Sequence, residues 1–127
     1  PDVTTLLRDI ADKVANQWNQ ARGKKSSSTC TFLTANALSL VLREALTETE
    51  QKVARTPAGR TLVQRQINQT LDSLYPQLAS LIEAKLHCYV AGSSVTVEPG
   101  SGNVRFTIEL REARRLYTLP QPLTACA

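Results

Sequence analysis

A long amphipathic segment in the middle of the chain constrains the fold more than any other feature. Apolar residues recur there at three- and four-residue steps on both sides of Pro76, a period typical of one face of an α-helix. A proline inside a helix removes one backbone hydrogen bond and usually kinks or ends the helix. Because the period continues in step across Pro76, the sequence predicts one kinked helix. The stripe consists of Val63, Ile67, Leu71, Leu74, Leu78, Leu81 and Ile82.

The N-terminal region predicts another amphipathic helix. Apolar residues follow the same helical period from Val3 to Trp18. Asp2 is suited to cap the first turn, because its carboxylate accepts a hydrogen bond from a free backbone N–H. Gly23 is placed to end the last turn, since glycine adopts the left-handed conformation at low cost. Trp18 lies on the apolar stripe and is expected in the core or in a dimer interface.

Two pairs of β-rich segments predict two hairpins. The segments Ser28–Leu33 and Leu38–Arg43 flank a short turn, and apolar and polar residues alternate along the second segment. The other pair surrounds the turn from Glu98 to Asn103, in which proline, glycine and asparagine favour a tight reversal. Each hairpin is therefore expected to bury one face.

Capping residues mark a helical corner between the two hairpins. Thr47 and Glu50 have the spacing at which each side chain satisfies the other's free backbone N–H, which predicts a short helix. Thr56 followed by Pro57 predicts the start of the long helix, because a proline at the first helical position loses no hydrogen bond. The chain is therefore expected to turn sharply between these two helices.

The predicted element order is α-β-β-α-α-β-β. Two hairpins that pair edge to edge, with helices that each carry one apolar stripe, indicate an α+β fold with a four-stranded, mainly antiparallel sheet and helices packed on one face. Residues 1–112 are expected to form a single α+β domain, and residues 113–127, which contain two prolines, a poorly ordered tail. Outward-facing valines, with Val41, Val95 and Val97 as candidates, would favour a homodimer, and we expect one.

Composition bounds the class of protein. The chain has 127 residues, of which 42% are hydrophobic and 20% charged, as is usual for one globular domain. No apolar run approaches the about 20 residues that cross a bilayer, so we expect a cytoplasmic protein without direct membrane insertion. The net charge of +4 permits attraction to phosphates. Aromatic residues make up only 5% and are not interleaved with cations, which disfavours stacking on single-stranded nucleic acid.

The sequence offers no set of residues for catalysis or metal binding. Cys30, Cys88 and Cys126 are widely separated and form no CxxC pair, which argues against a disulfide framework or a zinc site. His87 adjoins Cys88, but neighbouring residues in a strand point to opposite faces, so the pair is not placed for nucleophilic chemistry. We therefore expect no catalytic residue, no cofactor and no metal, and small buried roles for Cys30 and Cys88.

A basic cluster at the helical corner is the candidate binding site. No acidic residue lies between Glu50 and Asp72, and the start of the long helix favours an anion through its free N–H groups and dipole. The opposing interpretation is a solvated helix surface on which Arg60 pairs with Glu48 or Glu50. The anion- or partner-binding candidates are Lys52, Arg55, Arg60 and Arg65.

Several of these features occur together in one family. A Leu-Thr-x-x-Glu turn after a β-hairpin, a Gly-Arg pair at the start of a long helix and a closing strand pair are all present between Leu42 and Leu110. In this combination the chain resembles the MpsC-like family, small bacterial domains named for a sodium-translocating, membrane-potential-generating system. The matching residues are Leu46, Thr47, Glu50, Gly59 and Arg60.

The resemblance implies a non-enzymatic accessory or regulatory domain that binds a protein partner in a membrane cation or inorganic-carbon transport system, such as a transporter subunit. The resemblance assigns no active-site residues to this chain. The family's Gly-Lys-Gly-Pro-like turn is matched only by Gly23 and Lys24, so a function tied to that turn does not transfer. The alternative is a small anion- or nucleic-acid-binding module that combines the basic corner with Arg111, Arg114 and Arg115.

Overall fold

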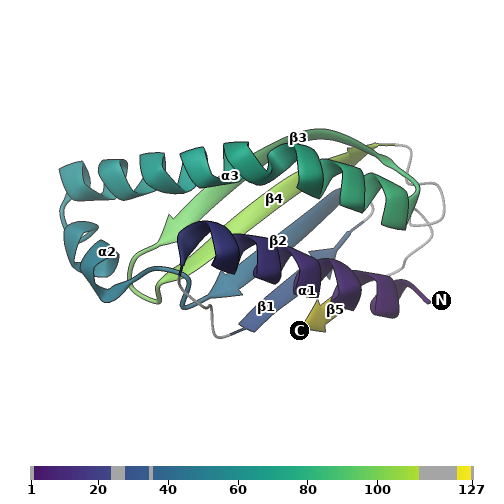
Figure 1. Cartoon of the computed structure of the whole chain (residues 1–127), viewed down its shortest axis with the longest axis horizontal. Coiled ribbons are helices and arrows are strands. Elements are labelled where there is room, and N and C mark those ends of the chain that lie inside the picture. The colour runs from purple at the N-terminus through teal and green to yellow at the C-terminus, as the bar shows by residue number, and fades with distance from the viewer. Residues whose placement is uncertain (1, 24–27, 35, 112–122, 127) are drawn as a thin grey trace.

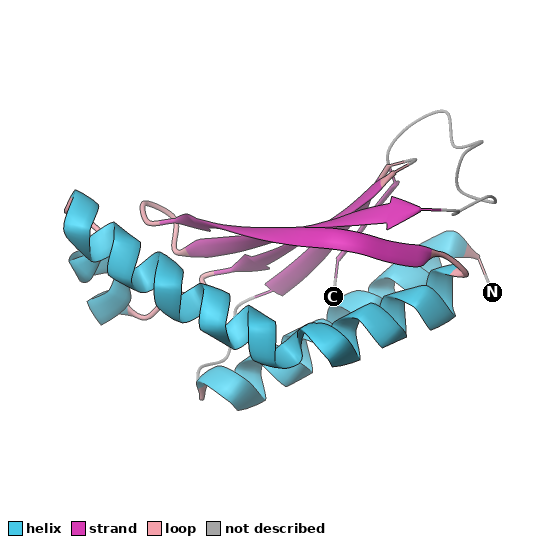
Figure 2. Ribbon diagram, turned by 90° about the horizontal axis from the view of Figure 1, so that it is seen from above, coloured by secondary structure: helices cyan, strands magenta, loops and turns pink. Residues whose placement is uncertain are grey.

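The computed structural model describes residues 2–23, 28–34, 36–111 and 123–126. This part of the chain forms an α+β fold in which a twisted antiparallel sheet carries all of the helices on one face (Figure 1, Figure 2). The sheet order is β3-β4-β2-β1-β5. The helices are α1 (Val3–Arg22), α2 (Glu48–Val53) and α3 (Pro57–Leu86), and the strands are β1 (Ser28–Leu33), β2 (Ala37–Arg43), β3 (Tyr89–Glu98), β4 (Asn103–Arg111) and β5 (Leu123–Cys126).

The predicted ends of α1 are confirmed. Asp2 is the N-cap, and its Oδ1 accepts a hydrogen bond of 2.8 Å from the backbone N–H of Thr5. Gly23 follows the last turn with a φ of 69°, and its N–H donates to the carbonyl of Asn19 at 2.8 Å. The left-handed conformation is one that glycine adopts without a Cβ penalty, so this glycine stops the helix.

The α2–α3 corner forms as its capping residues predict. The hydroxyl of Thr47 accepts from the N–H of Glu50 at 3.1 Å, while the carboxylate of Glu50 accepts from the N–H of Thr47 at 2.9 Å. Thr56 caps α3 by accepting from the N–H of Gly59 at 3.0 Å. The long helix then continues through Pro76 as a single element that changes direction along its length (Figure 2).

The expectation of four strands is wrong, because β5 adds a fifth strand beside β1. The hydroxyl of Thr31, in β1, donates a 3.0 Å hydrogen bond to the carbonyl of Ala125, whose side chain is buried. Only four residues long, this strand is too short for a period-2 signal in the sequence. It falls within the predicted tail. The boundary between 1–112 and 113–127 stays a prediction, since residues 113–122 lie outside the described residues.

The core lies between the helices and the sheet. On the helix side, Trp18 meets Phe106 edge to face with ring centroids 5.3 Å apart, an arrangement that the aromatic quadrupoles favour. The predicted stripe of α3 is confirmed, because five of its residues are buried and Leu74 packs against the core, while Leu81 is only partly buried. The largest fully buried side chains are Trp18, Phe106, Leu7, Ile10, Leu33, Leu38, Leu40, Leu42, Ile67, Ile82, Val14 and Val104.

The exposed edge of the sheet at β3 is protected by α3. Gln64 donates a 3.0 Å hydrogen bond to the carbonyl of Val95, and Glu83 accepts one of 2.9 Å from the N–H of Val90. Both backbone groups belong to an edge strand, where unpaired groups invite pairing with another chain. These two side chains of α3 therefore oppose extension of the sheet at this edge.

One prediction about the cysteines is confirmed and another is wrong. Cys30 and Cys88 are both buried, as predicted. However, Cys30 is disulfide-bonded, so the argument against disulfides is wrong for this residue. The β1–β5 register places Cys30 opposite Cys126, a juxtaposition that only the pairing of β5 creates.

Among the described residues, no helix is both long enough and apolar enough to cross a membrane.

Candidate functional site

The basic corner is held together by a close contact between α2 and α3. A Cβ atom added to Gly59 would lie 1.7 Å from the carbonyl oxygen of Val53, far closer than any real contact. The last turn of α2 therefore rests directly on the first turn of α3, and only glycine permits this approach. The glycine that precedes Arg60 in the sequence thus fixes how the cations of the two helices are placed.

Three of the four predicted cations gather around one open hollow of about 500 Å³. Lys52 and Arg55 reach it from the end of α2, and Arg60 reaches it from the first turn of α3. The opposite wall is the turn between β3 and β4, which is distant in sequence. The lining residues are Glu48, Gln51, Lys52, Ala54, Arg55, Arg60, Pro99 and Gly100.

Hydrogen bonds tie the hollow to the sheet. Gln51 donates through Nε2 to the carbonyl of Pro99 at 3.2 Å. The N–H of Leu46, just before α2, donates to the carbonyl of Gly102 at 3.0 Å. These bonds anchor the wall formed by the β3–β4 turn, so the hollow is part of the fold and does not depend on side-chain rotamers alone.

The fourth cation lies in a neighbouring depression. Arg65 lines an open hollow of about 380 Å³ on the surface of α3, and Arg60 belongs to both hollows. The structure therefore brings Lys52, Arg55 and Arg60 together and links Arg65 to them through Arg60. We call these four residues and the two hollows the basic corner.

The alternative in which Glu50 neutralises Arg60 is wrong. Glu50 instead forms an ion pair with Arg22 at the end of α1, and the two side chains are only 13% and 12% exposed. Burial disfavours the ionised form of Glu50, but the hydrogen bonds from Arg22 and from the N–H of Thr47 outweigh this and hold its pKa below the usual value. No ion pair joins the cations of the basic corner to an acid in the described part of the chain.

Arg22 was missed by the sequence analysis. Its guanidinium also lies 5.5 Å from the centre of the Trp18 ring, so the cation is held between an aromatic face and a carboxylate. The pair with Glu50 joins residues 28 positions apart. Neither helical spacing nor a strand pattern predicts a contact at that separation. The hollow-lining residues Pro99 and Gly100 were missed for the same reason.

The remaining candidates do not assemble into a reactive site. His87 is exposed and ends α3 with a φ of 52°, whereas the adjacent Cys88 is buried. Burial and the nearby charge of Glu83 raise the pKa of the Cys88 thiol, which disfavours the thiolate that nucleophilic chemistry requires. No group of three histidine, cysteine or acidic residues is placed to hold a metal within the ranges that the structure describes.

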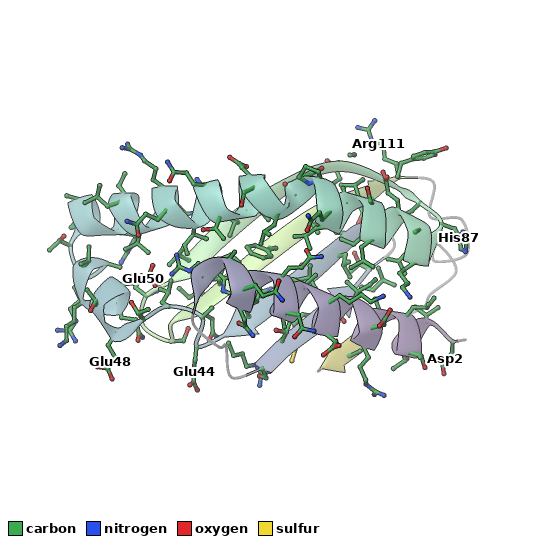
Figure 3. All side chains as sticks on the ribbon, viewed as in Figure 1. Asp2, Glu44, Glu48, Glu50, His87 and Arg111 are labelled. Carbon is green, nitrogen blue, oxygen red and sulfur yellow. The ribbon has the colours of Figure 1, made fainter. Side chains whose placement is uncertain are left out.

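The additional arginines of the alternative function do not extend the basic corner. Arg111 lies near the opposite end of the molecule from Glu48 and Glu50 of α2 (Figure 3). Arg114 and Arg115 lie outside the described residues.

Of the comparisons with known proteins, only the one with family models found a match. Neither the comparison with curated proteins nor that with solved structures produced a match. The family described as the Na+-translocating membrane potential-generating system (MpsC) matches residues 3–111, a span that includes α1 to α3 and β1 to β4. The features on which the resemblance rests, the capping box at Thr47 and the glycine at the start of α3, are both in place. The chain therefore belongs to the MpsC family.

Proposed function

We propose that this chain is a non-enzymatic accessory domain that binds a protein component of a membrane cation or inorganic-carbon transport system. In this proposal the basic corner receives acidic side chains of that component. The observation that carries it is the gathering of Lys52, Arg55 and Arg60, without an ion-pair partner among the described residues, around one anchored hollow. The family's description supplies the membrane system as the context.

Two exposed apolar side chains on the helices of the corner favour a protein surface as the ligand. Val53 and Leu62, on the two helices that form the corner, are 41% and 54% exposed. They are two of the three large apolar side chains that are exposed within the described residues. Exposed apolar side chains together with arginines are typical of protein interfaces, in which arginine is enriched. A hollow with cations on its walls suits protruding aspartate or glutamate side chains.

A nucleic acid is the alternative ligand, and the corner suits it less well. Sequence-tolerant binding of single strands uses aromatic side chains as stacking platforms, and none lines either hollow. Arg111 is too distant to extend the cationic track. Phosphate contacts would in any case be revealed by a steep loss of affinity as salt rises.

The test compares three forms of the chain as bait on detergent-solubilised membranes of the native cell. The first is the wild type, and the second carries Lys52→Gln, Arg55→Gln and Arg60→Gln. The matched control removes three cations elsewhere. Its substitutions are Arg8→Gln, Lys13→Gln and Lys85→Gln.

We expect the wild type and the control to capture an integral membrane subunit of an ion-translocating system, and the corner variant to lose at least about 90% of it, because charge-pair truncation at an interface weakens affinity tenfold or more. Nuclease treatment should leave capture unchanged. Equal capture by all three forms would contradict the role of the corner. Retention of nucleic acid alone, with steep salt dependence, would replace the protein partner by the alternative.

A further inference from the structure

The sheet face opposite the helices carries a regular arrangement of side chains that the basic corner does not involve. We call it the open face, because none of the described helices lies on it (Figure 2). The register of β4 with its neighbours β2 and β3 arranges its central residues in three rows. The middle row is Ser94, Thr107 and Ser39; the flanking rows are Thr96, Arg105 and Val41 on one side, and Gly92, Glu109 and Ala37 on the other.

Outward-facing valines, the basis on which a homodimer was expected, do not account for one on this face. Val97 is paired with the fully buried Val104 and belongs to the core, and Val95 packs against the same core. Val41 does lie on the open face, but it is only 6% exposed. A second copy therefore needs a different argument, and the pattern of the three rows provides one.

We propose that two copies of this chain pack face to face through their open faces. The twofold axis lies between the two sheets and parallel to them, runs along the middle row, and is perpendicular to β4 at Thr107. Such an axis stacks each strand on its own copy with the direction reversed, so the two flanking rows exchange places. Arg105 then meets Glu109 of the second copy, and Glu109 meets its Arg105. Thr107 meets itself, as does each other member of the middle row.

The rows complement one another in size as well as in charge. Under this symmetry Thr96 is opposite Gly92 of the second copy, and Val41 is opposite Ala37. Each larger side chain is thus placed over a small one, which lets the sheets approach to the about 10 Å typical of stacked sheets. The middle row has only hydroxyl side chains, and a hydroxyl both donates and accepts hydrogen bonds, so identical groups can pair across the axis.

A hollow on the open face provides space for the incoming arginine. It has a volume of about 460 Å³ and is lined in part by Ala37, Gly92, Thr107 and Glu109. Gly92 contributes no side chain to this hollow, and a Cβ there would make only an ordinary contact of 3.6 Å with the carboxylate of Glu109. In the single chain Arg105 is only loosely paired with Glu98, at 3.8 Å with both side chains about half exposed, so it is available to pair elsewhere.

The area of the face suits a reversible dimer. The three rows span β3, β4 and β2, and Val41 adds little accessible area because it is only 6% exposed. A contact of this extent falls below the about 800 Å² per partner of a standard stable interface, so a dimer that dissociates on dilution is expected. The twist of the two sheets, which cross at about 30°, makes the contact closest near the axis and looser at the edges.

Cross-linking tests the position of the axis. In a Cys88→Ala background, which removes the free buried thiol, Thr107→Cys places two cysteines opposite each other. A short bifunctional thiol cross-linker should convert most of this variant to a covalent dimer, because sheets stacked about 10 Å apart hold the two Cα atoms beyond the reach of a direct disulfide. In the matched control, Thr96→Cys, the two thiols are about 14 Å apart along the strands, too far to link. Equal cross-linking of both variants, or none of Thr107→Cys at concentrations where a dimer forms, would overturn the proposed register.

Charge reversal tests the contacts. Arg105→Glu and Glu109→Arg each place like charges opposite one another and should raise the dimer dissociation constant about tenfold or more, measured by sedimentation velocity over a concentration series. The double variant restores the pairing with the charges exchanged and should return the constant to within about threefold of the wild type. A wild type that remains monomeric throughout the series, or a double variant weaker than either single one, would overturn the dimer. Neither result bears on the basic corner, because no residue is shared.

Discussion

The α2–α3 corner holds two sets of charges, one turned inward and one outward. The inner set is Arg22 and Glu50, whose nearly buried side chains form an ion pair. Glu50 is also a member of the capping box of α2. The outer set is Lys52, Arg55 and Arg60, which are exposed around the hollow and have no ion-pair partner in the described part of the chain. The two sets meet at the same corner, where Arg22 comes from the end of α1 and the other four residues come from α2, α3 and the turn between them.

The difference shows how burial separates a folding role from a binding role. A charge that is removed from water must be paired, and removing its partner leaves an uncompensated buried ion. An exposed cation contributes little to folding, and three of them close together repel one another. The inner pair thus has an evident structural purpose, whereas the outer cations have none that the fold requires. Stability measurements should therefore separate the two sets.

The largest effect is expected from Glu50→Ala. This change leaves Arg22 nearly buried without its carboxylate and also removes half of the capping box, so the free energy of unfolding should fall by about 3–5 kcal/mol. Urea denaturation at neutral pH measures the loss. Glu48→Ala is the matched control, because Glu48 is an exposed glutamate in the first turn of the same helix and should cost less than about 1 kcal/mol.

A double-mutant cycle with Arg22→Met sharpens this result. If the pair is the cause, Arg22→Met combined with Glu50→Ala should cost clearly less than the sum of the single changes, because the second change then leaves no unpaired charge. If the two losses of unfolding free energy simply add, the loss from Glu50→Ala comes from the capping box alone, and the Arg22–Glu50 pair has no structural role of its own.

Gly59→Ala tests the contact that sets the outer cations in place. Helix propensity alone favours alanine over glycine by about 1 kcal/mol. The new Cβ would nevertheless collide with the carbonyl of Val53, which is backbone and has little freedom to move. We expect a net loss of about 1–3 kcal/mol in thermal or urea unfolding. Gly100→Ala is the control, since nothing lies within 4 Å of a Cβ there, and stabilisation by Gly59→Ala would contradict the close packing.

The same distinction between local and distant contacts explains what the sequence could predict. Asp2, Thr47 and Thr56 cap their helices through bonds that span three residues, and all three were predictable from spacing alone. The Arg22–Glu50 pair depends on how α1 and α2 meet in space, and no local rule indicates it. Similarly, the four cations are visible as a sequence cluster, but the hollow that three of them share requires the β3–β4 turn as its wall.

The fifth strand could not be predicted for a related reason. A strand of four residues carries too little pattern to be distinguished from coil, and its place in the sheet depends on an existing edge at β1. The argument against a disulfide was wrong for Cys30, which is disulfide-bonded and which the register between β1 and β5 places opposite Cys126. Long-range pairing, and not residue type, decides both features.

Acid titration should affect the inner pair in a predictable direction. The pKa of Glu50 is lowered below its usual value of 4.5 in the folded state, so the unfolded chain binds the proton first as the pH falls. Its contribution to stability is therefore fully present above the unfolded value and is lost as the pH falls through the folded value. Between neutral pH and about pH 3 the wild type should lose stability more steeply than Glu50→Gln. Parallel curves for the two proteins would show that Arg22 does not hold the carboxylate ionised.

The smallest effect on stability is expected from the outer set. Arg55→Gln combined with Arg60→Gln removes two exposed cations that no acid pairs with, so the free energy of unfolding should change by no more than about 0.5 kcal/mol, measured by the same urea titration. A small gain is the expected sign, because repulsion among neighbouring cations is relieved. Arg22→Gln is the matched control, since it removes one cation from the inner set of the same corner and should cost several times more. A loss from the outer pair as large as that from Arg22→Gln would show that these arginines serve folding, and the reason for assigning them to a partner would then disappear.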